Sequence, residues 1–300
     1  MPTAEEKAAA AAQKKEEAAR KKAEAQAVNE KRKAEAAAKK KAEEDAEREQ
    51  VMLGMGASGL KGDRGSMEDR AVVRRLSLGE RYCAVFDGHY GEGCAEYCQN
   101  KLHTLLQESP HWFAFEDKAA LKAAFAETHA RFMKEANDKT GTTATVALIR
   151  GRTLHVASVG NSRAVLFSGG KATALTKDGN SADGAPAGLI GTAPEPSERA
   201  LTPQDAFVLL ASDGVWNVLS NQKACELVQQ ALAAAQPPNT VEACRALCKA
   251  AHQVSHAHVH SPMSSHSCVH AFARPLSHPL SHPQAPPPYA QCFHMVKPHD

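Results

Sequence analysis

The sequence predicts an α+β fold with an antiparallel sheet at its core, confined to the middle of a 300-residue chain. Two observations predict the fold: short β-rich runs are joined by glycine-containing turns, and pairs of helix-like segments separate them. A third limits its extent, because all 19 glycines lie between Gly54 and Gly214. We therefore divide the chain into an N-terminal extension at 1–53, a domain at 54–251 and a tail at 252–300.

The N-terminal extension consists almost entirely of alanine, lysine, glutamate and arginine. Its first 50 residues include 17 alanines, and the other common residues are also strong helix formers. No apolar seam of the kind that a coiled coil needs is present. We predict a solvated helix that is frayed or partly disordered. The basic runs at 31–33 and 39–41 are candidate nuclear-import or RNA-contact patches, but the glutamates among them favour a simple solvated face.

The domain begins with a glycine-punctuated segment at 54–70 and then shows a defined order of elements. Alternating or continuous apolar runs predict strands, and apolar stripes of helical period predict helices. Two glycine-containing turns predict hairpins. The expected elements are strands at 71–73 and 82–86, helices at 92–106 and 118–135, hairpins 143–149 with 153–158 and 164–167 with 172–175, a strand at 207–211, and helices at 221–234 and 241–251.

The C-terminal tail at 252–300 has a different composition, since its 49 residues hold ten of the 15 histidines together with many prolines and serines. Such a segment cannot bury a core, and we predict that it is disordered. Its histidines are candidate weak ligands for a transition metal.

The charge and the cysteines exclude several classes of protein. The net charge of +2 is spread evenly, so no segment has the strong field expected of a nucleic-acid or membrane partner. No apolar run reaches the roughly 18 residues of a membrane span, and no secretory or transit signal is present. We expect a monomer in the cytosol or nucleus. The eight cysteines should be free thiols, and the pairs Cys94/Cys98 and Cys244/Cys248 small buried hydrophobes on one helix face.

Acidic residues at predicted strand ends or turns indicate a metal site. Glu68 and Asp69 precede the first strand, and Asp87 and Asp213 each follow a strand and precede a glycine. Carboxylates on one rim suit Mg²⁺ or Mn²⁺, and the carbonyl of a residue such as Gly88 can add a ligand. Two such ions can activate a water for in-line attack on phosphorus. Each Asp-Gly pair taken singly can also be an ordinary turn.

Two further residues fit phosphate chemistry. Arg64 lies five residues before Asp69, and its guanidinium can bind a phosphate with two parallel hydrogen bonds. His89 lies beside Asp87 and can protonate a leaving oxygen.

Five motifs follow one another along the domain: R-G-S-M-E-D at 64–69, F-D-G-H-Y-G at 86–91, G-T-T-A at 141–144, V-G-N-S-R-A at 159–164 and L-A-S-D-G-V-W-N-V at 210–218. In residues and in order they resemble the motifs of the metal-dependent protein phosphatases of type 2C (the PPM family). The resemblance covers roughly 54–228. It implies a β-sandwich of antiparallel sheets flanked by helix pairs, and hydrolysis of phosphoserine and phosphothreonine in protein substrates without a covalent intermediate.

We call Glu68, Asp69, Asp87 and Asp213 the acidic rim. Asp69 is a candidate metal ligand like the others, and the resemblance implies roles for the rest. Asp87 would bridge two Mg²⁺ or Mn²⁺ ions, Glu68 and the Gly88 carbonyl would serve the second ion, and Asp213 would bind the first. Arg64 would hold the substrate phosphate, and His89 would be the general acid.

Three departures from the family pattern matter for function. Asn161 and Asn217 stand where the family often has aspartates of a weaker third metal site, which should therefore bind poorly. The domain is shortened around 179–193, where we expect no strand. The family's closing D-N motif is absent, which removes one ligand of the first metal and suggests that the tail is foreign to the domain. The alternatives to an active phosphatase are a catalytically impaired pseudophosphatase that binds phosphoproteins or acts as a scaffold, and a product that does not fold.

Overall fold

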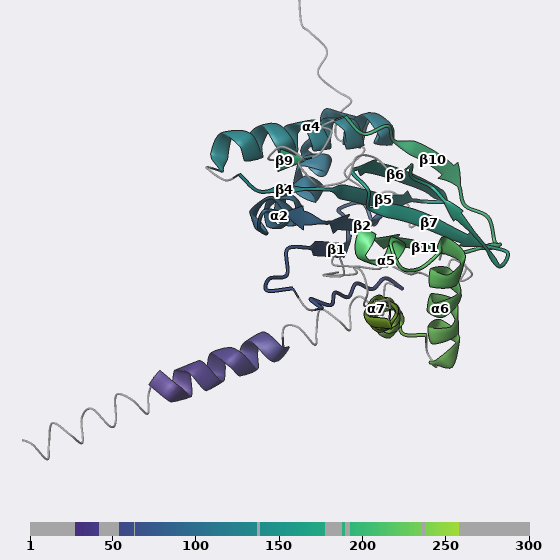
Figure 1. The fold of residues 1–300 in the computed structure, drawn as a ribbon. Coiled ribbons are helices and arrows are strands. Elements are labelled where there is room, and N and C mark those ends of the chain that lie inside the picture. The colour runs from purple at the N-terminus through teal and green to yellow at the C-terminus, as the bar shows by residue number, and fades with distance from the viewer. Residues whose placement is uncertain are drawn as a thin grey trace, which may run out of the picture. The chain divides into compact units, whose positions relative to one another are not determined.

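The computed structural model describes residues 28–41, 54–62, 64–136, 139–177, 188–189, 193–235 and 238–257. The chain divides into two units, Met1–Glu49 and Gln50–Asp300. The described part of the first unit is one helix over 28–41 whose side chains are exposed throughout, which confirms the predicted solvated helix (Figure 1). Of the tail predicted to be disordered at 252–300, residues 252–257 are helical, so the prediction is wrong there, and the remainder from 258 onward lies outside the described residues.

The second unit contains a five-stranded antiparallel sheet in the order β1-β2-β5-β6-β10. Its strands are β1 (Arg70–Arg75), β2 (Arg81–Phe86), β5 (Ala144–Arg150), β6 (Thr153–Val159) and β10 (Ser197–Ala200). A three-stranded antiparallel sheet has the order β11-β7-β8, formed by β11 (Asp205–Ala211), β7 (Arg163–Ser168) and β8 (Lys171–Ala174). The predicted strands and both predicted hairpins are confirmed.

A third sheet is built from strands of two residues each: β3 (Gly88–His89), β4 (Gly141–Thr142) and β9 (Gly188–Leu189). The expectation of no strand within 179–193 is therefore wrong at β9, which pairs with β4 in parallel. Gly188 has φ +89°, and a Cβ there would come within 2.7 Å of the His129 ring. A strand this short carries no hydrophobic period, so it could not be recognised from the sequence.

Helices cover the outer faces of the two larger sheets. The first group is α2 (Gly93–Glu108), α3 (Pro110–Phe113) and α4 (Asp117–Glu135), and the second is α5 (Asp213–Trp216), α6 (Asn221–Ala234) and α7 (Thr240–Ala257). Figure 1 shows α4 on one side of the strands and α6 and α7 on the other. The four long helices are confirmed, and α7 continues six residues beyond the predicted end at 251. No helix in the described ranges is long and apolar enough to span a membrane.

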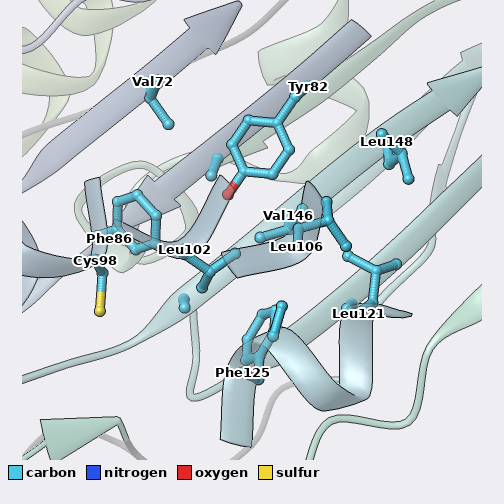
Figure 2. Close-up of a cluster of buried hydrophobic side chains, with 14 of the residues drawn as sticks. Val72, Tyr82, Phe86, Cys98, Leu102, Leu106, Leu121, Phe125, Val146 and Leu148 are labelled. Atoms are coloured by element: carbon cyan, nitrogen blue, oxygen red, sulfur yellow. The ribbon is translucent and has the colours of Figure 1, made fainter. Parts of the chain in front are cut away.

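The first buried cluster lies between the five-stranded sheet and its helices. Tyr82 and Phe86 of β2 meet Leu102 and Leu106 of α2 and Phe125 of α4, all fully buried (Figure 2). Burying such large side chains contributes about 1.5–3 kcal/mol each. This contact holds the C-terminal end of β2 against α2, and it thereby positions Asp87, which directly follows β2.

Successive side chains of a strand point to opposite faces of the sheet, so the neighbours of these residues lie in two further buried clusters. Cys83 of β2 and Val208 of β11 point between the two sheets, whereas Phe207 packs toward α6 and α7 and stacks on Phe167 at 5.1 Å between ring centroids. The result is a sandwich of two sheets with a helical layer on each outer face. All six described cysteines are buried and unbridged, including Cys94, Cys98, Cys244 and Cys248, as predicted.

Buried charges anchor α3 and α4 at the far end of β5. Arg150 forms ion pairs with Glu80 at 3.1 Å and with Asp117 at 3.0 Å, and its guanidinium lies 4.0 Å from the Trp112 ring centroid. His155 lies 3.2 Å from the second carboxylate oxygen of Asp117. Because each buried charge has a partner, this network orients the helices without leaving an uncompensated ion.

His103 makes the stability of the domain depend on pH. Burial, and then the charge of Arg74, lower the pKa of His103 to about 4, and the Arg74 Nη1 lies 2.7 Å from the His103 Nε2. An unfolded histidine titrates near pH ~6.5, so between about pH 6.5 and 4 the unfolded chain binds a proton that the folded chain does not. We predict that stability falls as the pH is lowered through this window. In His103→Gln, which can still accept from Arg74, the pH dependence of the melting temperature should be flatter; an unchanged slope would contradict the prediction.

Candidate functional site

Asp87 lies at the end of β2, where the chain enters β3. Its backbone N–H donates to the Thr143 hydroxyl at 3.1 Å, and the Thr143 N–H donates to the Asp87 carbonyl at 2.9 Å. The Gly88–Thr142 pairing of β3 with β4 continues this contact. The motif at 141–144 therefore holds the backbone of Asp87 from a position more than fifty residues away in sequence.

A chain of buried hydroxyl groups supports Thr143. Its Oγ1 lies 2.7 Å from the Ser162 Oγ, and Thr145 donates to the Ser162 carbonyl at 3.1 Å and lies 2.7 Å from the Ser158 hydroxyl. Gly160 has φ +93°, and a Cβ there would come within 2.6 Å of the Thr143 Cγ2. No motif or hydrophobic period in the sequence indicates this network. Thr145 and Ser158 face each other on β5 and β6, whereas Thr143 and Ser162 are fully buried just outside the strands.

Because Gly88 has no side chain, the backbone of Glu68 can approach the residue that directly follows Asp87. A Cβ at Gly88 would overlap the carbonyl oxygen of Glu68 and lie 3.2 Å from the Gly91 carbonyl oxygen. The Glu68 carboxylate accepts hydrogen bonds from the Gly91 N–H at 3.2 Å and from the Ser66 hydroxyl at 3.0 Å. Glycine is needed here because two backbone segments approach too closely for any side chain.

Three aspartates from separate parts of the chain interact at this point. Burial, and then the charge of Asp87, raise the pKa of Asp69 well above its ordinary value. Burial, and then the charge of Asp213, raise the pKa of Asp87 to about 7. Against these two effects, the nearby Ser212 side chain lowers the pKa of Asp69. Carboxylates crowded in this way are poorly compensated by the protein alone.

Asp213 begins the short helix α5, directly after β11. The Asn161 amide donates to the Asp213 Oδ2 at 3.1 Å, so this asparagine contacts the acidic rim. Asn217 is exposed, and its backbone N–H donates to the Asp213 carbonyl at 2.8 Å. The weak third metal site expected from these two asparagines stays a prediction.

Arg64 and His89 complete the candidate site. The side chain of Arg64 is exposed, and its charge lowers the pKa of Asp87, which places it beside the rim. His89 is 9% exposed and follows Gly88 in β3. The structure therefore brings together every residue singled out from the sequence: Arg64, Glu68, Asp69, Asp87, Gly88, His89 and Asp213. Their catalytic and metal-binding roles remain predictions.

The donor set fits hard divalent cations. Burial and neighbouring carboxylates raise the pKa of Asp69 and of Asp87, so Mg²⁺ or Mn²⁺ would neutralise charge that the protein compensates poorly, and the oxygen ligands match the preference of these ions. Within the described ranges no three His, Cys, Asp or Glu side chains are grouped closely enough to hold one ion. Such ions would therefore depend on few carboxylates together with backbone carbonyls and water, as Mg²⁺ sites commonly do.

Comparison with known proteins identifies the class. A family model described as protein phosphatase 2C matches residues 53–185 and 180–258. The chain belongs to the protein phosphatase 2C family. It is 29% identical over 221 residues to probable protein phosphatase 2C 52 of Oryza sativa subsp. japonica, covering 60% of this chain and 45% of that protein. It is 31% identical over 208 residues to probable protein phosphatase 2C 59 of Arabidopsis thaliana, covering 56% and 67%. The chain spans about half the length of the curated relatives it matches first.

Solved structures share the fold. A serine-threonine phosphatase 2C from Toxoplasma gondii superimposes with a TM-score of 0.59 at 17% identity, covering 73% of this chain and 94% of that one. A sex-determining protein of C. elegans gives a TM-score of 0.61 at 21% identity, covering 73% and 64%. The expected sandwich of antiparallel sheets flanked by helices is thereby confirmed.

The close approach at Gly88 predicts a position-specific cost. Gly88→Ala should lower the free energy of unfolding by about 1–3 kcal/mol, since backbone atoms must shift to admit a methyl group. Gly65→Ala is the matched control, because nothing lies within 4 Å of a Cβ at Gly65. Urea unfolding of both variants measures the difference. Equal effects of the two substitutions would contradict the proposed crowding.

The hydroxyl network predicts a second cost. Ser162→Ala removes the partner of the Thr143 hydroxyl in a fully buried position and should lower the free energy of unfolding by about 1–3 kcal/mol. Ser77→Ala makes the same chemical change at an exposed position and should stay within about 0.5 kcal/mol of the wild type. If thermal or urea unfolding finds the Ser162 variant as stable as the control, the network does not support Thr143.

Proposed function

We propose that the chain is a metal-dependent phosphatase that hydrolyses phosphoserine and phosphothreonine in protein substrates at a centre for two Mg²⁺ or Mn²⁺ ions. The gathering of Asp69, Asp87 and Asp213 from three separate segments is the observation that carries this proposal. Membership of the protein phosphatase 2C family supports it. A fold alone would not, because one fold can host many activities.

The residues of the rim have distinct tasks in this proposal. Asp87, Asp213, Glu68, Asp69 and the Gly88 carbonyl would hold the ions. When bound, the ions would supply Lewis-acid activation of a water and would stabilise the charge that develops on the phosphoryl oxygens.

The substrate would meet two further side chains. The exposed guanidinium of Arg64 would bind the phosphate through paired N–H groups and orient it toward the rim. His89 would donate a proton to the seryl or threonyl oxygen as that oxygen leaves. The Asp87–Thr143 hydrogen bonds hold the centre in place during this sequence, so little reorganisation is needed at the moment of reaction.

A pseudophosphatase that binds phosphoproteins is the second candidate function. One feature of the sequence favours it: no Asp-Asn pair follows Asp213, so the family's closing metal-binding motif is missing. In that case Arg64 and the surviving rim would bind a phosphorylated partner without turnover.

Hydrolysis of a phosphothreonine peptide tests the proposal. We predict turnover with Mn²⁺, none after removal of the metal by a chelator, and in Asp87→Asn a fall to the level of the metal-free reaction. Glu195→Gln removes one negative charge at an exposed side chain paired with Lys122, and it should keep the activity of the wild type.

The outcomes separate the candidates. Turnover that needs no metal, or that survives in Asp87→Asn, contradicts the two-metal centre. A cooperative thermal melt without turnover supports the pseudophosphatase. Absence of a cooperative melt supports a product that does not fold.

A further inference from the structure

Tyr90 combines an unfavourable backbone with an exposed aromatic ring. It directly follows β3 and has φ +60°, in the left-handed region that residues with a Cβ rarely adopt. Its side chain is 68% exposed. Its ring centroid lies 5.4 Å from that of His89, with the two planes at 77°. The edge contact places the ring beside the candidate general acid.

Fold stability does not explain this arrangement. Glycine adopts a positive φ without the steric cost that tyrosine bears, and so little of the tyrosine ring is buried that packing offers small compensation. A strained residue of this kind, next to a candidate catalytic residue, points to a role in binding.

We propose that Tyr90 is a specificity-determining residue whose exposed ring binds an aromatic side chain adjacent to the phosphorylated residue of the substrate. This inference rests on the proposed function. If the phosphorylated residue sits against His89, its neighbour in the peptide lies one Cα step, about 3.8 Å, further along. The Tyr90 ring centroid lies 5.4 Å from that of His89, a separation that this step and an aromatic side chain together span.

An aromatic neighbour suits the ring for a physical reason. Aromatic pairs favour offset or edge contacts with centroids about 4.5–7 Å apart and gain about 0.5–1.5 kcal/mol beyond simple burial. Tyr90 directly follows the two residues of β3 that pair with β4, so its backbone needs little further ordering on binding. The substrate class is therefore a phosphopeptide with phenylalanine, tyrosine or tryptophan beside the phosphorylated residue.

Phe115 offers a matched control within the same chain. It has φ +59° and an exposed fraction of 67%, nearly the same as Tyr90. It lies by Arg150 at the end of β5 opposite to the Asp87 contact, with the Arg150 guanidinium 4.8 Å from its ring centroid. The seven residues of β5 separate these ends by roughly 20 Å. Phe115→Gly thus removes a strained exposed aromatic without touching the rim.

Binding of two non-hydrolysable peptides, measured by isothermal titration calorimetry with Mn²⁺ present, tests the proposal. Both carry a phosphonate analogue of phosphothreonine, flanked on each side by phenylalanine in one and by glycine in the other. We expect the wild type to prefer the phenylalanine peptide by about 5- to 10-fold in Kd. This preference should fall below about twofold in Tyr90→Gly and persist in Phe115→Gly. A cooperative melt of each variant verifies that it is folded.

The readout is affinity, so it separates this inference from the proposed activity. A preference for the phenylalanine peptide that is lost only in Tyr90→Gly supports the inference, whether or not the phosphothreonine peptide is hydrolysed. Absence of hydrolysis would contradict the proposed activity and leave the inference standing. Equal binding of the two peptides by the wild type, a preference that persists in Tyr90→Gly, or no binding of either peptide would overturn the inference.

Discussion

Asp69 and Asp87 are buried close together, and the half-buried Asp213 lies beside Asp87. Like charges in such surroundings repel one another and lose hydration, and both effects raise the pKa values of Asp69 and Asp87. The neighbouring structure is arranged to keep these side chains in place despite that cost. Thr143 holds the Asp87 backbone, and Asn161 donates its amide to Asp213.

The sandwich supplies the rigidity that this arrangement needs. Tyr82 and Phe86 pack β2 against α2 and α4, so Asp87 directly follows a firmly held strand. On the second sheet, β11 is buried on both faces and delivers Asp213 at its end. The functional residues therefore lie on short connections between rigid elements, the usual location for binding and catalytic groups.

The amides near the rim change how a metal centre would be completed. Asn161 gives Asp213 a hydrogen bond in place of a second negative charge, which reduces repulsion among the carboxylates. In the part of the chain that the structure describes, no three acidic, histidine or cysteine side chains are grouped around one point, so the Gly88 carbonyl and water would complete the coordination. Hard cations that keep several waters are the ions compatible with such a set.

The long elements and the identity of the site residues could be predicted from the amino-acid sequence. Continuous apolar runs predicted β11, glycine turns predicted both hairpins, and five ordered motifs indicated Arg64, Asp87 and Asp213. These signals are local, because each depends on residues within one turn, strand or motif.

The residues that support the site could be identified only from the tertiary structure. The Thr143–Ser162 hydroxyl contact, the Asn161–Asp213 hydrogen bond and the close approach of Gly88 to Glu68 each join residues that are far apart in the sequence. The sequence also does not predict the strand β9 or the positive φ of Tyr90. Hydrophobic period and turn composition report local preference, whereas burial, hydrogen-bond partners and pKa shifts arise only when distant segments pack together.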